Sequence, residues 1–80
     1  MSLLDKTKAN LAFNVRVGRA ISSMTQEALA DAAKLQRSQI SLIERGDANP
    51  SLETLCKVAE ALETTLADLL SVPRHRSDLT

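Results

Sequence analysis

The sequence predicts a single all-α domain, and both its composition and its local pattern lead to this class. Its 80 residues include one Phe and neither Tyr nor Trp, so the core must be built from aliphatic side chains, which suits packed helices. With only two Gly and two Pro, the chain has little scope for the many turns of a β architecture. A chain this short is close to the size at which one core is only marginally stable, so we expect one domain.

Two short helices joined by a tight turn are predicted over residues 25–46. Thr25 is a suitable N-cap residue for the first helix, because its hydroxyl can accept a free backbone N–H. The apolar positions of this helix are Ala28, Leu29 and Ala32. The second helix covers about residues 36–45, with Ile40 and Ile43 inward, and ends at Gly46. Two such helices with almost no linker must meet at a steep angle, as in a helix-turn-helix.

A longer helix is predicted before this pair, over residues 8–22, with residues 1–7 frayed or only partly helical. One apolar stripe holds Leu11 and Val15, with Gly18 at the next inward position. A second stripe consists of Phe13, Val17, Ala20 and Ile21. Helix stripes usually face a core, so we expect Phe13 and Val17 to pack within the domain; the alternative is that they are exposed and meet a partner protein.

Two further helices are predicted after a loop over residues 47–50. Ser51 caps a fourth helix over about residues 52–62, and Thr65 begins a fifth that continues through Ser71. The core stripe of the fourth helix is predicted as Leu52, Leu55, Val58, Ala59 and Leu62. The domain then covers residues 1–72, with its core over about 8–71, and residues 73–80 form a polar tail predicted to be disordered.

Several motifs in a fixed order carry a family resemblance. They are MTQEALA at 24–30, ISLIERG at 40–46, NPSLETL at 49–55, AEAL at 59–62 and LADLL at 66–70. Together they resemble the lambda-repressor-like DNA-binding domains of the xenobiotic-response-element type, over roughly residues 11–70. The resemblance implies a compact five-helix fold in which the second and third helices form the helix-turn-helix.

Three positions depart from the family pattern. Gly18 stands where a leucine-sized residue is usual, so we expect close helix approach there, or replacement of the missing volume by Phe13 or Ile21. Lys34 occupies the turn where the family has a left-handed glycine, at a cost of about 1 kcal/mol if that geometry is kept. Gln36 replaces the usual Ser or Thr cap of the third helix, which predicts a weaker cap.

Charge is distributed unevenly although the formal net charge is zero. Residues 1–46 hold seven basic residues against four acidic ones, and residues 47–72 hold one against five. A basic side fits a DNA-facing surface. Neither a signal peptide nor an apolar run long enough for a membrane span is visible, so we expect a cytoplasmic protein without a membrane partner.

The outer face of the third helix is the predicted reading surface. An α-helix fits the major groove, where Arg can bond guanine, Gln can bond adenine and an apolar side chain can touch the thymine methyl group. The candidates for base contact are Gln36, Arg37, Ser38 and Leu42, with Arg37 and Gln36 as first choices. Leu42 either touches a thymine methyl or leans onto the neighbouring loop, and the sequence does not separate the two.

A second set of polar residues is predicted to hold the DNA backbone. By resemblance, Gln26 corresponds to the phosphate-clamping glutamine of the family. The further candidates are Arg19, Gln39, Ser41, Arg45 and Asn49. The resemblance also implies a partly buried ion pair between Arg19 and Glu44, which would join the first helix to the end of the third.

Catalysis is not expected from this sequence. Cys56 is expected to be a small core residue of the fourth helix, and the only histidine, His75, lies in the tail. No nucleophile–base pair, metal site or glycine-rich phosphate loop can be assembled from this inventory, so no cofactor, metal or small-molecule ligand is expected.

The predicted function is a sequence-specific DNA-binding transcriptional regulator acting as a homodimer on a two-fold symmetric site. The predicted dimer surface consists of Leu66, Leu69, Leu70 and Val72. The alternative is a protein-interaction module such as the antitoxin of a toxin–antitoxin pair, with Phe13 and Val17 as contacts. Phage-type repressor, restriction–modification controller and antitoxin all remain open at this point, as do the operator and the choice between activation and repression.

Overall fold

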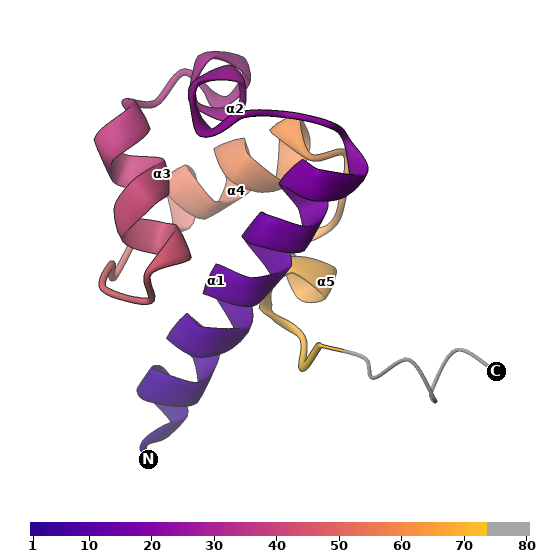
Figure 1. Ribbon diagram of the computed structural model, residues 1–80. Coiled ribbons are helices and arrows are strands. Elements are labelled where there is room, and N and C mark those ends of the chain that lie inside the picture. Colours follow the sequence, from indigo (N-terminus) through magenta and orange to yellow (C-terminus); the bar gives the residue numbers. More distant parts are fainter. Residues whose placement is uncertain (74–80) are drawn as a thin grey trace, which may run out of the picture.

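The computed structural model describes residues 1–73, and in this part of the chain it contains five α-helices and no strand (Figure 1). They are α1 (Leu3–Ile21), α2 (Gln26–Ala33), α3 (Arg37–Glu44), α4 (Leu52–Ala61) and α5 (Leu66–Leu70). The predicted all-α class and the number of helices are confirmed. The predicted disordered tail lies, from residue 74 on, outside the described residues.

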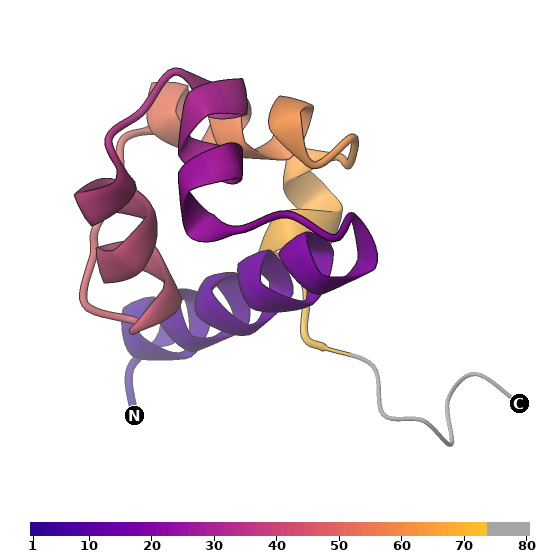
Figure 2. The same ribbon diagram turned by 45° about the horizontal axis from the view of Figure 1, so that its top comes forward.

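Helix α1 begins five residues earlier than predicted, so most of the segment 1–7, predicted to be frayed or only partly helical, belongs to the helix. The hydroxyl of Ser2 accepts the backbone N–H of Asp5 at 3.1 Å and caps the helix at Leu3. Asp5 also places a negative charge in the first turn, where the free N–H groups favour it. This extra length carries α1 past the C-terminal end of α3 (Figure 2).

Helices α2, α4 and α5 begin at the predicted capping residues. Thr25, Ser51 and Thr65 each accept, through the side-chain hydroxyl, a backbone N–H three residues later, at 3.0–3.1 Å. Lys34 keeps the left-handed conformation of the turn, with φ of 57°. The α2–α3 turn therefore has the family geometry without its glycine.

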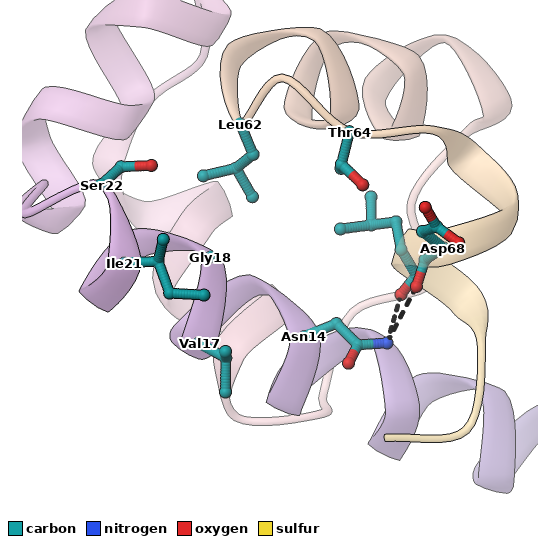
Figure 3. Close-up of a pocket in the computed structure, with 9 residues that line it drawn as sticks. Asn14, Val17, Gly18, Ile21, Ser22, Leu62, Thr64 and Asp68 are labelled. Carbon is teal, nitrogen blue, oxygen red and sulfur yellow. Dashed lines mark hydrogen bonds between the residues drawn. The ribbon is translucent and has the colours of Figure 1, made fainter. Parts of the chain in front are cut away.

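The core is aliphatic and draws on all five helices. Helix α1 contacts α3 and α5, while α2 packs against α3 and α4 (Figures 1 and 2). The largest fully buried side chains are Val15, Leu29, Ile40, Ile43, Val58 and Leu69. At Gly18 an added Cβ would lie 3.0 Å from Cδ1 of Leu62, so the side chain of Leu62, rather than a closely approaching helix, takes up the space beside this glycine (Figure 3).

Several predicted core positions are exposed instead. Phe13 is 42% exposed, and Val17 and Ile21 also face solvent, so the expectation that this stripe packs within the domain is wrong. Of the apolar positions named for α2, Ala28 and Ala32 are exposed, because the buried stripe consists of Leu29, Ala30 and Ala33.

Helix α4 shows two further errors of the same kind. Leu52 lies in the first turn and is mostly exposed rather than part of the core stripe. Cys56 is exposed as well, which contradicts its assignment to the core. It follows Leu55, and one residue rotates an α-helix by about 100°, enough to turn the next side chain out to solvent.

Candidate nucleic-acid interface

A buried ion pair joins α1 to the C-terminal end of α3. Arg19 donates from Nε to Oε2 of Glu44 at 2.6 Å and from Nη2 to Oε1 at 2.9 Å, and its Nη1 donates to the carbonyl of Met24 at 3.0 Å. Glu44 is 5% exposed and Arg19 is 22% exposed. The two parallel bonds match the planar guanidinium to the carboxylate, so the pair that the resemblance implied is present.

The charges of this pair are mutually stabilised. Burial alone would raise the pKa of Glu44, but hydrogen bonds from Arg19 and Gln26 and the charges of Arg19 and Arg16 together hold it below its ordinary value. The hydrogen bond to Glu44 in turn raises the pKa of Arg19. Because the Glu44 pKa is lowered on folding, its stabilising contribution is complete above the ordinary carboxyl pKa and is lost as the pH falls through the lowered one.

Two more side chains complete the junction. Gln26, the first residue of α2, donates from Nε2 to Oε1 of Glu44 at 3.1 Å. Arg16 donates from Nη1 to the backbone carbonyl of Glu44 at 2.6 Å, a contact that the sequence analysis missed. The sequence signal for this contact was the position of Arg16 on α1, one turn before Arg19. These bonds connect α1, α2 and α3 through the carboxylate and the backbone carbonyl of Glu44, and they fix the orientation of α3.

The outer face of α3 carries all four candidate base contacts. Gln36 is the N-cap residue, Arg37 and Ser38 follow in the first turn, and all three are exposed. The only partner of Arg37 among the described residues is Glu27, with 4.0 Å between Nε and Oε1 and both side chains exposed, a weak contact. Leu42 lines the hollow between α3 and the loop that contains Ala48 and Pro50, yet it remains 39% exposed. It therefore faces this hollow and still presents apolar surface to solvent.

The residues predicted to contact the DNA backbone differ in exposure and in the bonds that they already form. Arg45 and Asn49 are exposed; Nε of Arg45 lies 3.6 Å from Oδ2 of Asp47. Gln39 is exposed, but its Oε1 accepts the backbone N–H of Gln36 at 2.9 Å, which is the N3 half of a capping box and holds this side chain at the start of α3. Ser41 is half-buried, and Arg19 and Gln26 donate to Glu44 as described above.

The predicted dimer surface on α5 is only partly available. Leu69 is 2% exposed and belongs to the core, so its assignment to the dimer surface is wrong: a side chain in its own core offers no area to a second copy. Leu66 and Leu70 are half-buried against the same core. Val72 is 76% exposed.

Asparagine side chains of α1 hold the end of α5, which the sequence analysis also missed. Asn14 donates from Nδ2 to the carbonyls of Leu69 and Ser71, both at 2.8 Å. These carbonyls lie at the C-terminal end of a helix, where they have no partner within the helix. Asn14 also lines the cavity beside Gly18 and Leu62, together with Val17 and Ile21 (Figure 3).

Neither a metal cluster nor a transmembrane helix is found in residues 1–73. Within this part of the chain, no three His, Cys, Asp or Glu side chains come together as a metal site would require. None of its helices combines the length and apolar character needed to cross a bilayer. His75 lies outside the described residues.

An all-α domain with a short helix pair at positions 26–44, whose second helix has a buried face and an exposed polar face, defines the helix-turn-helix class of DNA-binding proteins. A comparison with family models agrees: the family described as Helix-turn-helix matches residues 19–69. The chain belongs to this family, in its lambda-repressor-like, xenobiotic-response-element branch, whose members are DNA-binding transcriptional regulators.

Known proteins of similar sequence or structure are regulators. The chain is 42% identical over 64 residues to the control protein C.SmaI of Serratia marcescens, covering 80% of this chain and 76% of that protein. A hypothetical transcription factor from Neisseria superposes with a TM-score of 0.83 at 35% identity, covering 92% of this chain and 85% of that one. The restriction–modification controller protein C.AhdI from Aeromonas hydrophila gives a TM-score of 0.74 at 32% identity, over 78% of this chain and 94% of that one.

Proposed function

We propose that the protein regulates transcription by reading an operator through α3 in the major groove. The observation that carries this proposal is the division of α3 into two faces. Ile40, Ile43 and Glu44 are buried, and other positions of the helix carry exposed polar side chains, among them Arg37, Ser38 and Gln39. The Arg19–Glu44 pair anchors the buried side, so the polar side is presented in one orientation, as a reading surface requires.

The chemistry of the exposed residues divides into base reading and backbone contact. Arg37 supplies the fork that matches guanine, Gln36 an amide that matches adenine, Ser38 a hydroxyl for either purine, and Leu42 apolar surface for a thymine methyl. Arg45, Asn49, Gln39 and Ser41 contact phosphates, and Gln26 does so from the N-terminus of α2, where free N–H groups attract anions. Arg19 contacts a phosphate through the guanidinium N–H groups that do not bond to Glu44 or Met24.

We further propose that two copies act together in the cytoplasm on an inverted repeat, because one domain of this size contacts few base pairs. Val72, with the partly exposed edges of Leu66 and Leu70, supplies the dimer surface. The name "control protein" of the relative from Serratia supports a regulatory role of this kind over that of an antitoxin.

The experiment that tests the proposal is a selection from random duplex DNA at two salt concentrations. An enriched inverted repeat is expected, with weaker binding at higher salt as counterions compete for the phosphates. Recovery of no sequence at either salt concentration would contradict operator reading by α3.

A second candidate function, a protein-interaction module such as an antitoxin, has one observation in its favour. Phe13, Val17 and Ile21 are exposed apolar side chains of α1. Val17 and Ile21 also line the cavity at Gly18 and Leu62 (Figure 3). If the Phe13→Ser and Val17→Ser variants keep salt-dependent DNA binding, operator reading does not depend on these apolar side chains.

A further inference from the structure

A basic cleft lies between the N-terminal half of α1 and the end of α3, outside the helix-turn-helix. Its volume is about 450 Å³. It is lined by the basic residues Lys8, Arg16 and Arg45 and by the small side chains of Ala9 and Ala12. We call it the α1–α3 cleft. It exists because α1 extends back to Leu3, so the N-terminal half of α1 lies beside the end of α3 (Figure 2).

The α1–α3 cleft carries a net positive charge. Three cationic side chains line it against one carboxylate, that of Asp5. Arg45 is balanced only by Asp47, at 3.6 Å between exposed side chains. Within residues 1–73, neither Lys8 nor Arg16 forms an ion pair with a carboxylate. The charge of the cleft is therefore available to an anionic ligand.

The guanidinium of Arg16 is held in place before any ligand arrives. Its Nη1 donates to the carbonyl of Glu44, and its Cζ lies 5.9 Å from the centroid of the Phe13 ring. One of its five N–H donors is used in this way, and the other four remain for an anion. A fixed donor loses less side-chain entropy on binding than a free surface arginine does.

The spacing of the cations suits an extended polyanion rather than a single small anion. Lys8, Ala12 and Arg16 follow one another at intervals of four residues along one face of α1. Lys8 and Arg16 are separated by about 12 Å along the helix axis. This is the axial length of about three to four nucleotides of one DNA strand. The small side chain of Ala12 between them leaves room for a sugar–phosphate backbone to approach the helix closely.

We propose that the α1–α3 cleft binds the sugar–phosphate backbone of the same duplex that α3 reads; this inference rests on the proposed function. Arg45, the exposed C-cap residue of α3, also lines the cleft, so the cleft adjoins the end of the reading helix. An acidic protein segment has similar charge, but this adjacency favours DNA. Lys8 and Arg16 add backbone contacts that set affinity and register without reading sequence.

The test is an ethylation-interference footprint and a salt titration on the most enriched selected duplex, with wild type, Lys8→Gln, Lys8→Arg and, as a matched control, Lys57→Gln. Lys57 is a lysine of α4 outside the cleft, and it pairs with Glu53 at 3.4 Å. We expect Lys8→Gln to lose interference at one or more phosphates, to bind several-fold more weakly and to lower the salt slope by about one. Discrimination against random DNA should not change, Lys8→Arg should restore the lost phosphate, and Lys57→Gln should match wild type.

An unchanged footprint and salt slope for Lys8→Gln would overturn the inference while leaving operator reading by α3 intact. Failure of the wild type to enrich any duplex would instead overturn the proposed function. Binding of a poly-glutamate peptide that depends on Lys8, with no change in the DNA footprint, would assign the cleft to an acidic protein partner and would also overturn the inference.

Discussion

Two regions of the molecule differ in which side chains they bury. The junction between α1 and α3 buries polar groups, whereas the outer face of α1 and α5 exposes apolar ones. At the junction, a carboxylate that is 5% exposed receives three hydrogen bonds from the side chains of Arg19 and Gln26. On the outer face, Phe13, Val17 and Val72 remain exposed although they are apolar. Polar groups are buried where the orientation of α3 has to be fixed, whereas the outer face leaves apolar side chains of the described residues exposed.

This contrast predicts how the two regions respond to substitution. Changes at the junction should lower stability and disturb α3, because a broken pair leaves a buried charge. Changes at exposed positions of the outer face should leave the fold intact and alter association alone. Four experiments test this division, from the largest expected effect to the smallest.

Removal of Arg19 should have the largest effect. Arg19→Met strands the Glu44 carboxylate, and breaking a buried ion pair costs about 3–5 kcal/mol. Because Arg19 keeps some exposure, we expect the lower end of this range, measured as the free energy of unfolding in urea. The double variant Arg19→Met with Glu44→Leu should recover much of the loss. A loss below about 1 kcal/mol in the single variant would mean that the junction does not hold α3.

Leu69 lies on α5 but should behave as a core residue. Leu69→Ala removes a fully buried side chain, and such truncations cost about 2–5 kcal/mol. Thermal unfolding of the variant at a concentration where wild type is monomeric isolates the effect on the fold. A stability equal to that of wild type, together with lost self-association, would return Leu69 to the dimer surface.

Arg37 should affect DNA affinity rather than stability. Arg37→Ala removes an exposed side chain, and the loss of one bidentate base contact costs about 1–3 kcal/mol in specific affinity. Fluorescence anisotropy with the selected duplex and with random DNA measures this loss and the discrimination together. If discrimination is unchanged, Arg37 does not read a base.

Val72 should give the smallest change in stability. Val72→Asp alters an exposed residue, so we expect a change within about 0.5 kcal/mol and the conversion of a dimer to a monomer in sedimentation velocity. Leu52→Asp, at another exposed apolar position, is the matched control and should remain dimeric. Equal sedimentation of wild type and Val72→Asp would exclude Val72 from the dimer surface.

Local structure such as helix caps was predicted better from the sequence than whether each apolar helix face is buried. The caps at Thr25, Ser51 and Thr65 are confirmed because a cap depends on residues within one turn. The Arg19–Glu44 pair was available only through resemblance, because its partners are 25 residues apart. Phe13 and Cys56 were assigned wrongly because helical periodicity places residues on a face without saying what covers that face.

Polar contacts between distant segments were the other part that the sequence did not predict. Asn14 reads as an ordinary surface amide of a helix, and only the packing of α5 onto α1 gives it carbonyls to bond. Arg16 was missed because its acceptor is a backbone carbonyl, which has no signature in the side-chain pattern. The candidate base contacts on α3 remain predictions, although the structure places all of them on an accessible face.

The bonds from Asn14 to the end of α5 have a consequence for synthesis on the ribosome. Asn14 is made early and its acceptors, the carbonyls of Leu69 and Ser71, are made near the end of the described chain. Leu69 is also a core residue, so a nascent chain that stops short of it lacks both the last piece of the interior and the acceptors for Asn14. The domain therefore reaches its full stability only when residues 69–71 are available to pack against α1.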